Sequence, residues 1–243
     1  QSARVRLLEV VHRRVEVLVG LAVVVAALGG TLSWGFYRHD VAVIVNAAIS
    51  LAAIAVPVGL DLLAPYWVGV RLSIPLQLPL LIGVAGLLHM LGMVGWYDTI
   101  WWWDHVTHTV SAALIATIVY AWLLVVGLDS PTTVPVDPKL ATVGLTLLAG
   151  VVWELVEWAL RLLSGRLGIE RLVKHYGRYD TPLDILFDVV GAALVVAADI
   201  RLFVPAFAPI PDYVRLLLSS LLVAFGVGFI LSVAVVAYGR SAW

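Results

Sequence analysis

The sequence has no cysteine and few charged residues, and both absences restrict what the protein can do. A chain without cysteine forms no disulfide, iron–sulfur cluster or thiolate zinc site, and it has no cysteine nucleophile. The net charge of −1 gives no electrostatic reason to expect nucleic acid as a partner. Glycine motifs that bind phosphate or dinucleotides and the nucleophile elbow of hydrolases are also missing.

Charged residues make up 13% of the chain and hydrophobic residues 62%, whereas soluble domains contain about 25% charged residues. The excess apolar surface must face lipid, so a bilayer is the expected partner. A spanning helix needs about 20 apolar residues, and barrel strands would instead show short alternating segments. We therefore predict an all-α fold, a polytopic transmembrane bundle of about seven spans that forms a single domain over residues 1–243. The expected spans are Val15–Phe36, Val41–Leu63, Ile74–Trp96, Asp104–Val126, Pro138–Leu163, Pro182–Phe203 and Tyr213–Tyr238.

Two basic segments flank these spans, a leader at residues 1–14 and a loop at residues 164–180. The loop fits either a short amphipathic helix on the membrane surface or a solvated connection. Arg and Lys divide almost equally between the two sides of a seven-span protein, so their distribution does not decide the orientation. The Arg-rich leader by itself favours a cytoplasmic N-terminus.

Ionisable residues recur inside the third to sixth spans, although a charge at the bilayer centre costs about 2.5–3.5 kcal/mol. Several form pairs spaced three or four residues apart, so that each pair shares one helix face. Because consecutive spans alternate in direction, the groups fall within roughly 3–14 Å of the same interface, at about 1.5 Å per residue. These residues are His89, Asp104, His105, His108, Glu154, Glu157, Asp184 and Asp188.

Imidazoles and carboxylates crowded at one depth cannot all stay charged and unpaired, so a cation or shared protons must neutralise some of them. Imidazole with carboxylate suits zinc, iron or manganese, and helix bundles hold one or two such ions between facing pairs. One carboxylate, Glu157 or Asp188, is instead the candidate catalytic base. The predicted ligands of a divalent metal, in a mononuclear or dinuclear site, are His105, His108, Glu154, Glu157, Asp184 and Asp188.

Some polar residues have simpler explanations. His89 and Asn46 are typical hydrogen-bond partners between membrane helices, and Asp104 can cap the start of its helix. Long basic side chains reach nearby acids or the interface. The expected pairs are Arg161 with Glu157, Asp61 with Arg71 and Asp199 with Arg201.

Three functions therefore stay open. The first is an integral membrane metalloprotein, including a metal-dependent enzyme on a lipid or small apolar substrate. The second is a cation or proton-coupled transporter, for which Asp61 and Asp199 near the opposite face are the only hint. The third is a structural subunit of a membrane complex, as a homo- or hetero-oligomer. The sequence leaves undecided whether the protein is an enzyme.

Three motifs together resemble the YjdF-like family of bacterial and archaeal membrane proteins. The resemblance covers about residues 74–200 and implies a multi-pass α-helical protein in the plasma membrane of a prokaryotic cell. It implies no particular reaction. The motifs are Asp104-His105-x-x-His108, Trp153-Glu154-x-x-Glu157 and Asp180-Thr181-x-x-Asp184-x-x-x-Asp188-x-x-Gly191-Ala192.

Overall fold

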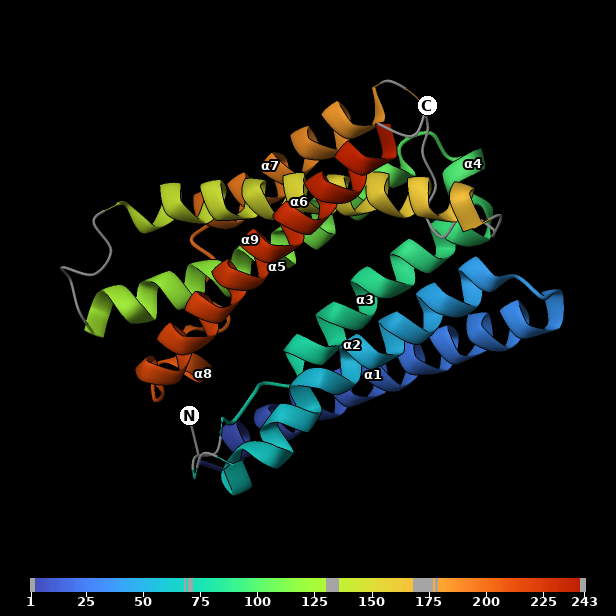
Figure 1. Ribbon diagram of the computed structural model, residues 1–243. Coiled ribbons are helices and arrows are strands. Elements are labelled where there is room, and N and C mark those ends of the chain that lie inside the picture. The colour runs from blue at the N-terminus through green and yellow to red at the C-terminus, as the bar shows by residue number, and fades with distance from the viewer. Residues whose placement is uncertain are drawn as a thin grey trace. The chain divides into compact units, whose positions relative to one another are not determined.

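The computed structural model describes residues 3–67, 69, 72–129, 136–167, 177 and 179–240, and all regular secondary structure in these ranges is helical. The predicted all-α fold class is thus confirmed for this part of the chain (Figure 1). The elements are α1 (Ala3–Arg38), α2 (Val41–Trp67), α3 (Gln77–Leu91), the π-helical η1 (Gly92–Trp96), α4 (Tyr97–Thr99), α5 (Trp103–Asp129), α6 (Pro138–Leu167), α7 (Asp180–Ala197), α8 (Val204–Phe207) and α9 (Pro211–Arg240).

Within the described ranges, five helical stretches are long and apolar enough to cross a membrane. Five of the seven predicted spans correspond to these stretches, and the other two correspond to α7 and α9. The five stretches are Val11–Arg38, Val41–Tyr66, Gln77–Thr99, Trp103–Gly127 and Pro138–Arg166.

The observed helix ends differ from the predicted ones for local reasons. The third span begins at Gln77 rather than Ile74, because Pro75 biases the residue before it away from the helical region. The sixth helix ends at Ala197 rather than Phe203, because Asp199 adopts a left-handed conformation with φ 51°. The Ile200 N–H then donates to the Val195 carbonyl over 3.0 Å, the capping pattern that terminates a helix.

The bounds of the predicted basic leader, residues 1–14, and the predicted basic loop, residues 164–180, also differ from the helix bounds in the structure. Described leader residues from Ala3 onward belong to the same helix as the first span, α1. Helix α6 continues to Leu167, so the predicted loop begins later than Ser164. The centre of that loop, residues 168–176, and residue 178 lie outside the described residues.

The chain divides into two compact units, residues 1–96 and 97–243. In the first unit α1, α2 and α3 contact one another (Figure 1). His89 on α3 lies with its Nε2 atom 3.2 Å from Asn46 Oδ1 on α2, which confirms the expected hydrogen-bond role of both residues. Asp61 accepts a hydrogen bond from the Ile74 N–H over 3.1 Å, while its expected partner Arg71 lies outside the described ranges.

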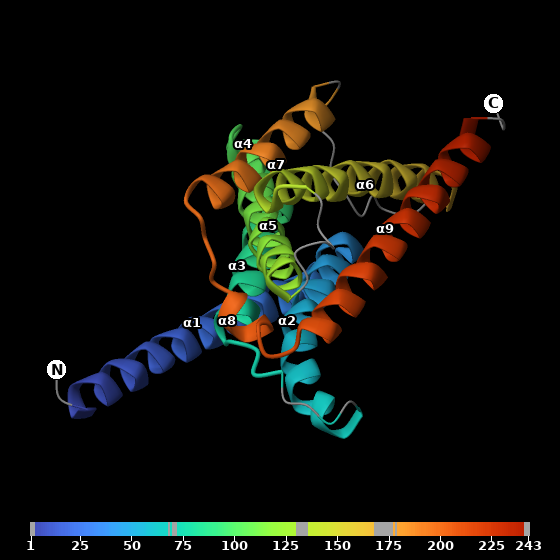
Figure 2. The same ribbon diagram turned by 90° about the vertical axis from the view of Figure 1, so that its left-hand side faces the viewer.

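In the second unit α5, α6 and α7 contact one another, and α9 lies against α6 and α5 (Figure 2). Helices α5 and α7 run parallel, since His108 meets Asp188 near their beginnings and Tyr120 meets Asp199 further along. The buried Tyr120 hydroxyl donates to Asp199 over 2.6 Å, and Arg201 lies 2.8 Å from the same carboxylate, which confirms the Asp199–Arg201 pair. Hydrogen bonds from Arg201 and Tyr120 hold the pKa of Asp199 below its usual value.

Small residues bring α5 and α7 unusually close together. A Cβ atom added to Gly191 on α7 would overlap the carbonyl oxygen of Thr109 and lie 3.0 Å from the backbone nitrogen of Ala113 on α5. Further along the two helices, the buried side chains between them are Ala116, Tyr120, Ala192 and Val195. Glycine and alanine allow this backbone contact between membrane helices, so Gly191 sets the spacing of the helices that carry the ionisable pairs.

Replacing Gly191 by alanine should lower the melting temperature of the detergent-purified protein, because the new methyl group forces α7 away from α5. Overpacking of this kind costs about 1–3 kcal/mol of stability. Gly144→Ala on α6 is the control, since no atom of the described residues lies within 4 Å of a Cβ built there. The control should melt at or above the wild-type temperature, because alanine favours helix over glycine. A Gly191→Ala protein as stable as the control would contradict the close contact.

Candidate metal site

The ionisable pairs of the second unit meet where α5 and α7 begin. Asp104 and His108 lie on the first two turns of α5, and Asp184 and Asp188 lie on the second and third turns of α7. Helix α6 runs in the opposite direction and brings Glu154 to the same level, where Thr181 of α7 contacts it. The partial positive charge at helix N-termini favours carboxylates there.

The His108 ring faces carboxylates on both sides. Its Nδ1 atom lies 3.1 Å from Asp188 Oδ1, within hydrogen-bonding distance. Its Nε2 atom lies 3.7 Å from Asp184 Oδ1 and 3.9 Å from Asp104 Oδ1. An ionised Asp188 can only accept, so it favours the neutral tautomer with the proton on Nδ1. In that tautomer the Nε2 lone pair points toward two further acids.

Asp104, His108 and Asp184 form a triad that could hold a metal ion, because one ligand atom of each lies within 4.8 Å of the others. Asp184 is only 3% exposed, and its buried Oδ1 atom has no hydrogen-bond partner among the described residues. A buried acceptor without a partner costs about 1–3 kcal/mol, and more when it is charged. A cation at the centre of the triad would satisfy this oxygen and the Nε2 lone pair together.

Glu154 is a second buried acid with an unsatisfied oxygen. The residue is 7% exposed, and its Oε2 atom accepts a 2.5 Å hydrogen bond from the Thr181 hydroxyl. Its Oε1 atom is buried and has no hydrogen-bond partner in the described part of the chain. The carboxylate interacts electrostatically with His108, which places it beside the triad rather than within it.

Both oxygens of Glu157 have partners on its own helix. Trp153 Nε1 donates to Oε1 over 2.9 Å, and Arg161 lies 3.4 Å from Oε2. The expected pair of Arg161 with Glu157 is therefore confirmed. Because Arg161 neutralises the carboxylate, Glu157 has less need of a metal than Asp184 or Glu154.

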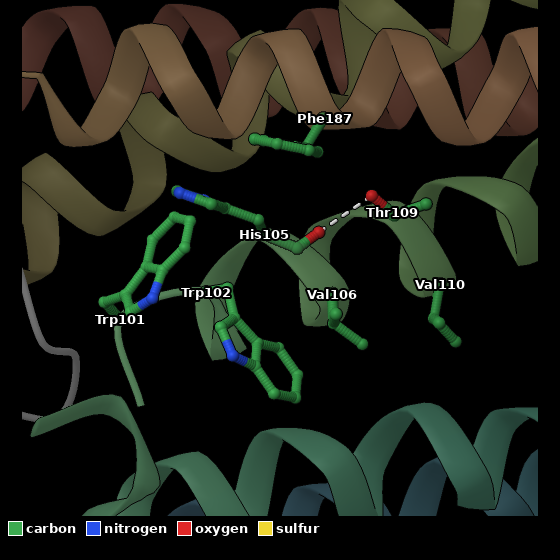
Figure 3. A pocket seen from close by; sticks show the side chains of 7 residues that line it. All are labelled: Trp101, Trp102, His105, Val106, Thr109, Val110 and Phe187. Atoms are coloured by element: carbon green, nitrogen blue, oxygen red, sulfur yellow. Dashed lines mark hydrogen bonds between the residues drawn. The ribbon is translucent and has the colours of Figure 1, made fainter. Parts of the chain in front are cut away.

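His105 lies apart from the triad, although only three residues separate it from His108. Its ring stacks on Phe187, with centroids 4.3 Å apart and an angle of 8° between the rings (Figure 3). Trp101 contacts it edge-on at 6.1 Å. Together with Trp102, Val106, Thr109 and Val110, these side chains line an apolar pocket of about 280 Å³. The buried Nδ1 atom of His105 has no hydrogen-bond partner among the described residues.

The structure adds residues to the site that were not among its predicted ligands. Asp104, considered as a helix cap, points its carboxylate into the triad, and the i,i+4 spacing to His108 was the available signal. The Tyr97 hydroxyl lies 3.3 Å from the Thr107 hydroxyl, which in turn donates to the Asp104 carbonyl over 2.8 Å. Thr181 bonds Glu154, as described above. The remaining addition, Gly150, has a contact with Asp188 that no spacing rule reveals.

Comparisons with known proteins agree with the membrane assignment. No curated protein and no solved structure matches the chain. The model of one family, described as "Predicted membrane protein (DUF2238)", matches residues 17–204. The match confirms that the chain belongs to a family of membrane proteins. It does not confirm the name YjdF-like for that family. The chain is a multi-pass membrane protein and belongs to the DUF2238 family.

Proposed function

We propose that the protein is a membrane metalloprotein in which Asp104, His108 and Asp184 bind one divalent cation. The observation that carries the proposal is the buried Oδ1 atom of Asp184, which has no hydrogen-bond partner in the described part of the chain and faces the Nε2 atom of His108. Two carboxylates balance the charge of a divalent ion, and the ligand set suits zinc, iron or manganese. Three protein ligands leave a position open for water or substrate, as in catalytic metal sites.

The distances in the triad suit a cation better than a proton shared with His108. A direct N–H···O hydrogen bond spans about 2.7–3.2 Å, but His108 Nε2 lies 3.7 and 3.9 Å from the two carboxylates. Two ligands of one zinc ion, each bound at about 2.1 Å, lie roughly 3.4 Å apart in a tetrahedron. Small side-chain movements would therefore close the triad around an ion.

The triad is the one group of three such ligands within reach in the described ranges, so we propose a mononuclear rather than dinuclear site. The predicted bases Asp188 and Glu157 already have partners in His108 and Arg161. Glu154 has an unpartnered oxygen beside the triad and is the acid to which we assign the role of base. A lipid or small apolar substrate fits the location, and the apolar pocket beside His105 supports that choice.

Transport has less support than metal chemistry. Asp61 and Asp199 were the only hint of a path toward the opposite face. Both have structural partners, the Ile74 N–H for Asp61 and Tyr120 with Arg201 for Asp199. Neither carboxylate therefore needs a transported ion or proton to explain its place.

We also propose that α7 and α9 complete a bundle of seven spans in the plasma membrane of a prokaryotic cell. The 18 residues of α7 rise about 27 Å, close to the roughly 30 Å thickness of the hydrocarbon core. The 30 residues of α9 exceed that thickness. Asp184 and Asp188 reduce the hydropathy of α7, and a site that uses both explains why the helix carries them.

The first prediction of this proposal concerns metal content. The purified chain, reconstituted with Zn²⁺, Fe²⁺ or Mn²⁺, should bind one ion, measured by elemental analysis and by titration calorimetry. His108→Ala and Asp184→Asn should weaken binding by more than the roughly 10–100-fold that the loss of an orienting residue costs. Asp212→Asn is the control, because this acid is exposed and pairs with Arg215 at 3.0 Å. A wild-type metal content near zero after reconstitution would refute the proposal.

The second prediction concerns α7. Because the chain has no cysteine, single cysteines at the exposed positions Val136, Tyr179 and Ala208 report on each connection separately. If α6 and α7 both cross the bilayer, an impermeant maleimide should label Val136→Cys and Ala208→Cys from one side of sealed vesicles. Tyr179→Cys should react only from the other side. Labelling of Tyr179→Cys and Ala208→Cys from the same side would show that α7 does not span.

A further inference from the structure

We infer that Gly150 on α6 is a positioning residue for the metal site, because its missing side chain lets the Asp188 carboxylate reach His108. The inference rests on the proposed metal function for its consequence, although the geometry stands without it. A Cβ atom at residue 150 would overlap Asp188 Oδ2 and lie 3.2 Å from Asp188 Cγ. Both atoms belong to the carboxylate whose other oxygen lies 3.1 Å from His108 Nδ1.

The contact is specific to this glycine. Gly144 and Gly165 lie on the same helix, and a Cβ at either position meets no described atom within 4 Å. Glycine in the interior of a helix is unfavourable compared with alanine, so Gly150 needs a reason of its own. The three nearest atoms that a Cβ at residue 150 would meet all belong to Asp188.

The position of Asp188 matters because its contact with Nδ1 determines whether the Nε2 atom of His108 can bind a metal ion. A carboxylate that accepts the Nδ1 proton fixes the tautomer and orientation of a metal-binding imidazole and makes Nε2 a better donor. Asp188 is 6% exposed, so a displaced carboxylate has little water to turn to. A methyl group at residue 150 would push the carboxylate toward α5 or rotate it, and either movement disturbs the hydrogen bond to Nδ1.

The test is a double-mutant cycle on the full-length protein in detergent, with Zn²⁺ as the probe. Gly150→Ala and Asp188→Ala should each weaken Zn²⁺ binding by roughly 10–100-fold. In the Asp188→Ala background, Gly150→Ala should cause no further loss, because the carboxylate that it displaces is gone. Gly144→Ala should bind Zn²⁺ like wild type. Equal losses from Gly150→Ala in both backgrounds would overturn the inference, since the substitution would then act through general packing.

A second measurement separates this inference from the proposed function. ¹⁵N NMR of histidine-labelled protein, with the His108 signals assigned from His108→Gln, reports which ring nitrogen carries the proton. At a pH high enough for the imidazole to be neutral, wild type should show the proton on Nδ1, and Gly150→Ala should lose that preference. If wild type binds no Zn²⁺ but this change occurs, the metal function fails and the positioning role stands. An unchanged His108 spectrum in Gly150→Ala overturns the positioning role.

The cycle remains decisive if Gly150→Ala does not fold. Folding of the Gly150→Ala/Asp188→Ala protein, judged by a single symmetric peak in size-exclusion chromatography, would then show that the clash is with Asp188 and would support the inference. Failure of both proteins to fold, with Asp188→Ala alone folded, would overturn it, because residue 150 would then be intolerant for reasons unrelated to Asp188.

Discussion

The second unit depends on one imidazole that faces carboxylates on both of its nitrogens. The contact between His108 Nδ1 and Asp188 joins α5 to α7 inside the protein, and Nε2 faces Asp104 and Asp184. A buried polar group is costly unless it is paired, and in a membrane protein there is little water to pair it. The arrangement of the three helices follows from bringing these groups together, since a shift of α7 by one residue would separate every pair.

Glycine makes that arrangement sterically feasible. Gly191 lets the backbones of α5 and α7 touch, and Gly150 leaves room for Asp188 beside α6. The two contacts have different roles. The Gly191 contact determines how closely α5 and α7 pack, and the Gly150 contact determines where the Asp188 carboxylate lies. Helix association in membranes relies on such close packing, because lipid provides no hydrophobic drive between helices. The polar site and the apolar packing therefore share α7, which carries Gly191 against α5 and Asp188 against Gly150 of α6.

Sequence patterns predicted the helical, multi-pass fold and the helices that supply the site, because apolar length and i,i+4 spacing depend only on local geometry. They also predicted the pairs Arg161–Glu157 and Asp199–Arg201. They did not separate His105 from His108, since residues three apart differ by about 60° around a helix and the neighbouring helix decides which one faces the site. Phe187 holds His105 elsewhere, and the contact of Gly150 with Asp188 depends on the register between helices, which no spacing within one helix records.

The charge balance gives the site its chemical character whatever the protonation of His108. Even a fully protonated imidazole brings one positive charge to three neighbouring aspartates, and the beginnings of α5 and α7 add only about half a charge each. Arg161 is already paired with Glu157, so it offsets an acid of its own helix. While its aspartates are ionised, the triad therefore attracts cations and repels anions. A divalent ion in the proposed site would offset two of the three aspartate charges, so it would weaken the repulsion of any substrate with an anionic head group.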